Sequence, residues 1–209
     1  DIFFHSERKL IDYNGWLIFV QPYLNGSRPD IIIFHPKVGV QIFEVKDWEL
    51  NHYNFQKDNK GKLYFYVSDS RGNYQIKSPK KQVEYYKKKL TGVLIPNIGE
   101  KIDESSRNYG LIKTAVYFDN ASTQRVQELF KVEDINFKVF PFFGKDFLSK
   151  EKLDYIVPAS KFSNSKFWNT EWNEEILFWL KPPLHSLEQT VKLSLNNAQK
   201  KFSEPLEGH

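Results

Sequence analysis

The sequence predicts an α/β fold with a central mixed sheet flanked by helices, followed by a helical C-terminal extension. β-branched and aromatic runs bounded by turn residues recur through residues 1–145 and are typical of strands. Within this part, a strand at 111–118, a helix at 123–131 and a strand at 137–143 follow one another, as in a parallel crossover. We therefore expect one core over residues 1–145 and helices over residues 146–209.

The composition indicates a folded globule of mildly basic character. The 209 residues are 40% hydrophobic and 16% aromatic, and the net charge of +4 with a pI of about 9.0 is compatible with nucleic-acid binding. The absence of cysteine excludes disulfides and thiolate zinc sites and allows a reducing cytosol. No apolar run approaches the ~20 residues that span a bilayer, so we expect a cytoplasmic protein without membrane contact. The lack of methionine suggests part of a longer chain.

A predicted β-hairpin gathers three charged side chains. Two strand-like runs, 30–34 and 40–46, are separated by a turn that contains proline and glycine. A hairpin centred on this turn places Asp30 opposite Glu44, and Glu44 shares a face with Lys46 because side chains alternate along a strand. Two acids and a lysine then converge at the end of an apolar hairpin, which is costly unless something binds them.

These residue types suit metal-assisted hydrolysis of phosphodiesters. Asp30 and Glu44, at the ends of adjacent strands, can hold Mg²⁺ or a substituting Mn²⁺, while waters and a substrate phosphate complete the octahedron. The carbonyl of Val45 is a further candidate ligand. Lys46 would orient or deprotonate the attacking water and offset charge on the phosphorane. The alternative is a hairpin with surface charges, in which Glu44 and Lys46 form a weak ion pair.

The segments beside the hairpin predict further elements. Residues 3–13 indicate a short first helix and residues 16–20 the first strand, separated by Asn14-Gly15. Residues 52–76 mix polar and aromatic side chains and predict short antiparallel strands or an extended loop. Their aromatic residues would either stack on unpaired bases or form the packed face of a strand.

A capped helix is expected at residues 78–90. Ser78 is the predicted N-cap and proline lies in the first turn. Gln82 lies one turn before Tyr86, and three side chains form the buried stripe: Val83, Tyr86 and Leu90. Tyr86 and five lysines are candidate nucleic-acid contacts, the alternative for the lysines being a solvated helix face: Lys80, Lys81, Lys87, Lys88 and Lys89.

Pro29-Asp30 followed by Glu44-x-Lys46 resembles the PD-(D/E)xK nuclease superfamily, and Gln82-x-x-x-Tyr86 is similar to the QxxxY motif of RecB-type nucleases. Over the first half to two-thirds of the chain, the order of these residues resembles the nuclease-related domain (NERD), a branch of that superfamily. The resemblance implies a restriction-endonuclease-like core, Mg²⁺-dependent cleavage of DNA and a Gln82 amide that helps to organise the metal site.

The resemblance also suggests a role for Glu7, which sits where many relatives carry an acid on the first helix that can reach a second metal or its water. The alternative is a solvated glutamate favoured by the helix dipole. The stretch between Lys46 and Gln82 is long and aromatic here, so the substrate contacts of the family are not carried over.

Beyond residue 145 the sequence predicts a charged helix at 145–155, a Trp-rich amphipathic helix at 168–180 and a last helix at 184–202. The tryptophans are expected to dock the second of these on the core: Trp168, Trp172 and Trp179. The last segment resembles the lead-in to the first nucleotide-binding loop of superfamily-1 helicases. No GxxxxGK[ST] motif occurs, so no ATPase is assigned to residues 1–209; if the polypeptide continues, a helicase module is expected beyond residue 209.

Two functions of different classes follow. The first is a Mg²⁺-dependent deoxyribonuclease with Asp30 and Glu44 as ligands, Lys46 as catalytic cation and Gln82 in support. The second is a non-cleaving module that binds nucleic acid or protein and is attached to a helicase. The sequence leaves open the oligomeric state, the choice between DNA and RNA, and the process served, whether repair, phage defence or plasmid turnover.

Overall fold

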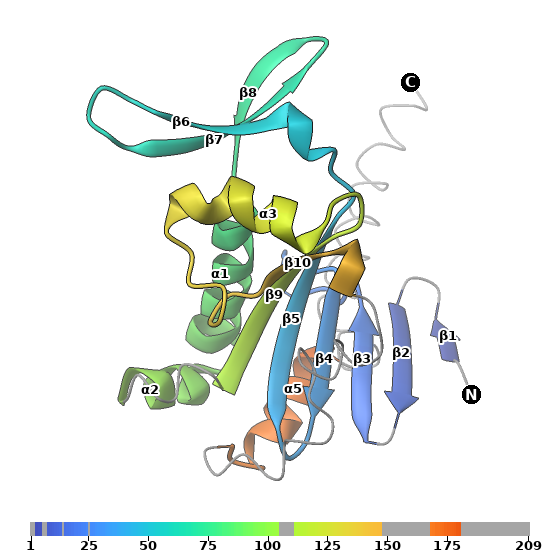
Figure 1. The fold of residues 1–209 in the computed structure, drawn as a ribbon. Helices are drawn as coiled ribbons and strands as arrows, with labels where there is room; N and C mark the ends of the chain where they lie inside the picture. The colour runs from blue at the N-terminus through green and yellow to red at the C-terminus, as the bar shows by residue number, and fades with distance from the viewer. Residues whose placement is uncertain are drawn as a thin grey trace, which may run out of the picture.

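The central element of the fold is a mixed seven-stranded sheet, whose strands lie side by side across the view of Figure 1. The computed structural model describes residues 3–5, 8–13, 15–24, 26–104, 111–147 and 168–180, with only the backbone for 3–5 and 8–13. Its strands, in spatial order, are β1 (Phe3–His5), β2 (Arg8–Tyr13), β3 (Trp16–Val20), β4 (Ile31–His35), β5 (Gly39–Lys46), β9 (Ile112–Phe118) and β10 (Phe142–Gly144).

The direction of the strands confirms the predicted α/β class. The strands from β1 to β5 pair antiparallel with one another, whereas β9 pairs parallel with β5, and β10 pairs parallel with β9. The connection from β9 to β10 passes through α3 (Thr123–Phe130) and a 3₁₀ turn at Lys131–Glu133, which is the expected parallel crossover. Antiparallel hairpins thus supply one half of the sheet, and helical crossovers supply the other.

A second sheet is inserted between β5 and the first helix. After a 3₁₀ turn at Leu50–His52 it contains β6 (Tyr53–Lys57), β7 (Leu63–Asp69) and β8 (Gly72–Ile76), paired antiparallel in that order. Figure 1 shows this sheet beyond the carboxyl end of β5. The Trp48 ring stacks on Tyr53 with centroids 4.3 Å apart, and Phe65 lies 5.5 Å from Phe130 of α3. These aromatic residues therefore form the packed face of the predicted strands.

Local signals place the helices. In α1 (Pro79–Lys89), Ser78 caps the first turn by accepting a hydrogen bond from the Lys81 N–H at 3.4 Å, and Pro79 occupies a position where no donor is needed. The helix continues as a π-helical turn, Leu90–Leu94, followed by α2 (Pro96–Glu104). A 3₁₀ turn at Lys145–Phe147 and α5 (Trp172–Leu180) complete the described elements.

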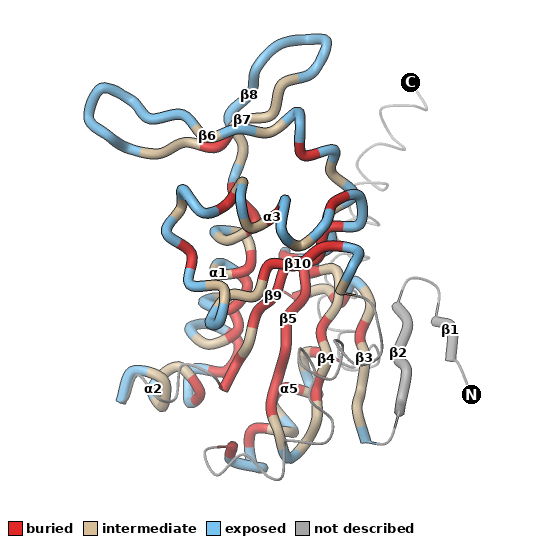
Figure 2. The backbone as a smooth tube through the Cα atoms, viewed as in Figure 1, coloured by how far each residue is buried: buried red, intermediate tan, exposed pale blue. Residues whose placement is uncertain are grey.

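The main core lies between one face of the sheet and the helices α1, α2 and α5. Ile42 of β5, Leu90 after α1 and Ile176 of α5 are each completely buried there. Trp168 and Trp172 belong to the same cluster, and the Trp179 indole donates to the Leu94 carbonyl at 3.0 Å. The expectation that these tryptophans dock on the core is confirmed. Figure 2 shows β5 and β9 buried along most of their length, in contrast to the exposed tips of the second sheet.

The predicted helix over residues 3–13 is wrong, because the structure has β1 and β2 there. Tyr13 pairs with Trp16, so β2 and β3 form a hairpin, and Gly15 directly before β3 has φ +80°. Asn-Gly favours this kind of turn because both positions accept positive φ. The dipeptide therefore marks a hairpin and not the end of a helix.

Two further elements differ from expectation. The strand predicted at 137–143 is reduced to β10, because the N–H groups of Val139 and Phe140 both donate to the Asn136 carbonyl at 2.9 Å and form a turn. No helix is predicted over α2, whose interior contains Gly99. A Cβ at Gly99 would lie 2.5 Å from the Thr91 carbonyl oxygen, so glycine is what lets α2 pack on the preceding turn.

Among the described helices, none is both long and apolar enough to cross a membrane. The boundary near residue 145 stays a prediction, although α5, beyond it, packs on the core. The helix predicted at 184–202 and the greater part of the one predicted at 145–155 lie outside the described residues.

Candidate active site

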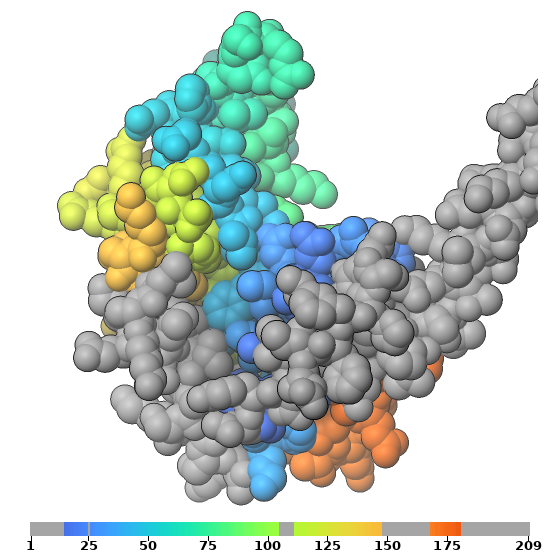
Figure 3. Space-filling model, turned by 90° about the vertical axis from the view of Figure 1, so that its right-hand side faces the viewer, coloured from blue at the N-terminus to red at the C-terminus, as the bar shows by residue number. Residues whose placement is uncertain are grey.

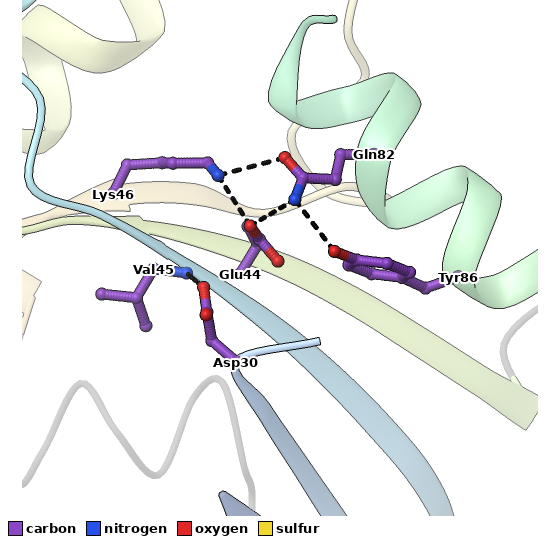
Figure 4. Close-up of polar contacts among 6 residues, drawn as sticks. All are labelled: Asp30, Glu44, Val45, Lys46, Gln82 and Tyr86. Carbon is purple, nitrogen blue, oxygen red and sulfur yellow. Dashed lines mark hydrogen bonds and ion pairs between the residues drawn. The ribbon is translucent and has the colours of Figure 1, made fainter. Parts of the chain in front are cut away.

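The β4–β5 hairpin adopts the predicted register. Ile31 pairs with Phe43 and His35 with Gly39, so Asp30, directly before β4, lies beside the carboxyl end of β5. The Val45 N–H donates a hydrogen bond of 2.7 Å to Oδ2 of Asp30 (Figure 4). This bond fixes the Asp30 carboxylate against β5.

Glu44 and Lys46 share the face of β5 that α1 covers. The Lys46 ammonium donates to Oε1 of Glu44 at 2.6 Å. The Lys46 side chain is only 12% exposed, and the Glu44 side chain is only 5% exposed. Glu44 lies at the centre of the sheet, because β5 is flanked by β4 and β9. The Val45 side chain, between them in sequence, points away from Glu44 in Figure 4, as strand alternation requires.

Gln82, in the second turn of α1, joins the acid and the lysine. Its Oε1 accepts from Lys46 at 3.0 Å, and its Nε2 donates to Oε1 of Glu44 at 2.5 Å and to the Tyr86 hydroxyl at 2.9 Å. The amide oxygen thus faces a cation and the amide nitrogen faces acceptors. Figure 4 shows the four side chains as a connected network between β5 and α1. Tyr86 is buried, which anchors the network to the core.

The site holds more negative charge than its neighbours neutralise. Burial raises the pKa of Glu44 above its usual value; the Lys46 ammonium opposes this, and the nearby Asp30 carboxylate adds to it. Oε2 of Glu44 is buried and has no hydrogen-bond partner among the described residues. A buried carboxylate oxygen of this kind carries a desolvation penalty unless a cation or donor compensates it. This orphaned oxygen marks the position where a positive ligand fits.

The donor set fits a small hard cation. Among the described residues, no group of three or more histidine, aspartate or glutamate side chains could hold a metal. Asp30 and Glu44 are therefore a two-carboxylate set of oxygen donors, and Mg²⁺ is commonly bound by one or two carboxylates together with waters and substrate phosphates. The carbonyl of Val45 stays a predicted ligand.

The lysines of α1 do not form one continuous basic face. Lys87 is buried, with 6% of its surface exposed, which corrects its assignment as a nucleic-acid contact. It follows Val83 and Tyr86 and precedes Leu90 at the spacing of one helix face, so the helical period places it inside. Burial lowers the pKa of Lys87 to about 8.

The remaining candidates are distributed differently. Lys80 pairs with Glu84 at 3.4 Å, and the Lys89 ammonium donates to the Ser27 hydroxyl at 3.1 Å. Lys81 and Lys88 are exposed. Tyr86, also predicted as a nucleic-acid contact, points into the network and is 8% exposed. Glu7 lies outside the described residues.

One residue near the site was missed by sequence reasoning. The Lys46 ammonium lies 5.1 Å from the ring centroid of Trp48, a cation–π distance. Two-residue alternation after Lys46 could have suggested Trp48, since it continues the same face of the chain. The ring limits where the ammonium can move.

The sheet and the site together define a nuclease-like α/β core, in which two acids and a lysine meet at the ends of adjacent strands and a helix glutamine joins them. A comparison with protein-family models matches residues 4–119 to the NERD family, the nuclease-related domain. This match covers more than half of the chain, and the chain belongs to that family. Searches of curated proteins and of solved structures gave no significant match.

Proposed function

We propose that this protein is a Mg²⁺-dependent nuclease that hydrolyses phosphodiester bonds of DNA. The observation that carries the proposal is Oε2 of Glu44, which is buried beside Asp30 and has no hydrogen-bond partner in the described part of the chain, with Lys46 on the same face. A purely structural ion pair would be expected to satisfy both oxygens of a buried carboxylate. An unsatisfied oxygen next to a second acid is instead suited to a divalent cation.

Each side chain has a separate role in the proposed reaction. When bound, Mg²⁺ would polarise the phosphate and lower the pKa of a coordinated water. Asp30 and Glu44 provide the charge that holds the cation, and the Val45 N–H keeps Asp30 in place. Lys46 orients the attacking water and stabilises charge on the phosphorane through its ammonium.

Gln82 and Trp48 would act on Lys46 and not on the substrate. Two of the three N–H groups of Lys46 are used by Glu44 and Gln82 among the described residues, which leaves one for a water or a phosphate oxygen. The Trp48 ring lies beside the same ammonium. Such preorganisation matters because a charge held in place before the reaction needs no reorganisation in the transition state.

The test is a digest of linear duplex, closed circular duplex and single-stranded DNA, with RNA as a further substrate, in Mg²⁺ or in EDTA. The expected result is Mg²⁺-dependent cleavage of DNA that disappears in EDTA and in the Lys46→Ala variant. Lys113→Ala is the matched control, because Lys113 is a half-buried lysine on the opposite face of the same sheet. It should cleave like the wild type.

Absence of cleavage of every substrate with Mg²⁺ and with Mn²⁺ would overturn the proposal and leave a non-cleaving binding module. Digestion patterns would also separate cutting within a strand from cutting at its ends, since only the first linearises or nicks the circular duplex. A helicase module in the same polypeptide and a cytoplasmic location stay proposals, which rest on the sequence of residues 184–202 and on the cysteine-free composition.

A further inference from the structure

An exposed aromatic side chain lies next to the site on α1. Positions 82, 85 and 89 follow the i, i+3, i+7 spacing of one helix side, so Tyr85 and Lys89 continue the side that carries Gln82. Gln82 points into the network with Glu44, whereas Tyr85 is 50% exposed. The solvent-facing border of the site on this helix is therefore an aromatic ring and a lysine.

The same ring borders the segment that leads to Asp30. Ser27 is 6% exposed and is held by a tight pairing with Leu24, with N···O distances of 2.8 and 3.0 Å. Its hydroxyl accepts from Lys89 at 3.1 Å and is hydrogen-bonded with Tyr85. Because Ser27 precedes Asp30 by three positions, Tyr85 is tied to the short segment that carries a proposed metal ligand.

Two cations accompany Tyr85. The ammonium groups of Lys77, which follows β8, and of Lys89 lie 5.5 and 5.7 Å from the ring centroid. The hydrogen bond with Ser27 and the charge of the lysines lower the pKa of the Tyr85 hydroxyl, as expected in a positive potential. The neighbouring acid Glu84 is already paired with Lys80 at 3.4 Å. Figure 3 shows a hollow between the second sheet and the segment joining β3 to β4.

We propose that Tyr85, Lys77 and Lys89 form a subsite for an unpaired nucleotide of the substrate strand, next to the scissile phosphate. The base would stack on the Tyr85 ring, and the lysines would pair with the flanking phosphates. The inference rests on the proposed nuclease function and specifies its substrate as a strand that is single-stranded at this position.

Stacking of a base on the Tyr85 ring is expected to be stronger than the cation–π contacts that the ring makes with Lys77 and Lys89. An exposed cation–π contact is weak, and stacking of a base on an aromatic side chain is stronger. A base that binds here can therefore displace a lysine ammonium from the Tyr85 ring. The displaced ammonium can then form an ion pair with a flanking phosphate. In an intact duplex both faces of each base are already stacked, so the ring has no base face to contact. The subsite accordingly discriminates between single-stranded and duplex substrates.

The test is the dissociation constant of labelled single-stranded and duplex DNA of the same sequence, measured by fluorescence anisotropy in EDTA so that no cleavage occurs. Tyr85→Ala should weaken single-strand binding by about 5- to 150-fold, the scale of one base–aromatic stack. Tyr85→Phe, which keeps the ring, should bind nearly as the wild type does. Tyr74→Ala is the matched control, because Tyr74 on β8 is similarly exposed at 43%, and it should have no effect.

A base-deletion scan identifies the nucleotide. An abasic nucleotide is placed at successive positions of the strand. At one position it should lower the affinity of the wild type, and at that same position it should not lower the affinity of Tyr85→Ala any further. Lys89→Ala should in turn reduce the slope of log K against log salt by about 0.7, the value for one phosphate contact of a single strand.

Two results would overturn the subsite. One is an equal loss of affinity for single-stranded and duplex DNA in Tyr85→Ala. The other is that the effects of the abasic nucleotide and of the substitution are additive at every position. Because these readouts need no catalysis, a protein that fails to cleave but shows the coupling loses the nuclease proposal and keeps the subsite. A protein that cleaves but shows no coupling keeps the nuclease proposal and loses the subsite.

Discussion

The Lys46 ammonium and the Glu44 carboxylate form a one-sided pair: Nζ lies 2.6 Å from Oε1, while Oε2 is buried without a hydrogen-bond partner among the described residues. A buried ion pair is often no more stable than apolar side chains of the same volume, because desolvation offsets the attraction. This pair is less favourable still, since one oxygen is unsatisfied. The geometry is therefore better explained by the proposed cation site than by a contribution to folding.

Asp30→Asn separates the charge of Asp30 from its structural bond. The amide keeps an oxygen that can accept from the Val45 N–H, now 2.7 Å from Oδ2 of Asp30, but it carries no charge. Cleavage should fall by about 10²-fold or more, whereas the free energy of unfolding should change by less than about 1 kcal/mol. Initial cleavage rates and chemical denaturation measure the two quantities. A variant that cleaves at the wild-type rate would remove Asp30 from the site.

Gln82→Ala should reduce turnover less than loss of Lys46 does. Gln82 contacts Lys46, Glu44 and Tyr86, so its removal loosens the catalytic groups without removing one. We expect a fall in kcat of about 10- to 100-fold, smaller than the ~10²–10³ for a group that contacts the transition state. Tyr86→Phe is the matched control, since it deletes a single acceptor of the Gln82 amide, and its kcat should fall by less. A larger effect for Tyr86→Phe would contradict this order.

Lys87 should make stability depend on pH in the alkaline range. Its pKa is lowered from 10.5 to about 8 in the folded state, so between these values the unfolded chain binds a proton that the folded chain has lost. The free energy of unfolding contributed by this group therefore rises with pH across that window and is lowest below pH 8. The full effect is on the order of 3 kcal/mol.

The Lys87→Met variant isolates this effect. Methionine fits the buried position without a charge, so the variant should be more stable than the wild type at pH 7 and lack the alkaline rise. Urea denaturation of both proteins across pH 7 to 10.5 measures the difference. The variant should also keep the salt dependence of DNA binding, because Lys87 is buried. A wild-type alkaline rise that persists unchanged in Lys87→Met would contradict the assignment.

Trp172 should show that α5 is part of the core. Trp172 is 7% exposed and its ring packs edge-on against Trp168 at 5.3 Å, so Trp172→Ala should cost about 3–5 kcal/mol of stability. Phe178, on the same helix but 37% exposed, is the matched control, and Phe178→Ala should cost well under half as much. Thermal or urea unfolding gives both values. Equal costs would mean that α5 does not dock through its Trp172 side.

The parts of the site that the sequence predicted depend on local rules. The hairpin register follows from the turn and from two-residue alternation, which is why Asp30, Glu44 and Lys46 meet as expected. Gln82 follows from helix geometry after a capped start at Ser78. Strand period, helix period and caps act over a few residues, so a single sequence contains enough information to place them.

The errors arise where one signal has two meanings or where the contact is distant in sequence. Asn14-Gly15 suits a helix end and a hairpin alike, and the pairing of Tyr13 with Trp16 decides for the hairpin. Lys87 has the composition of a surface residue, but its position on the helix buries it. Oε2 of Glu44 is buried without a hydrogen-bond partner among the residues that the structure describes, and this depends on how several elements pack together, so it cannot be predicted from the sequence alone.

The most direct test of the account compares Mn²⁺ binding with cleavage in the wild type and in Lys46→Ala. Mn²⁺ affinity, measured by electron paramagnetic resonance, should be kept or increased in the variant, because the ammonium 2.6 Å from Glu44 no longer competes for the carboxylate. Its cleavage rate at saturating Mn²⁺ should fall by about 10²–10³-fold, because no group remains to orient the water. A variant that binds Mn²⁺ and cleaves DNA at the wild-type rate would contradict the account.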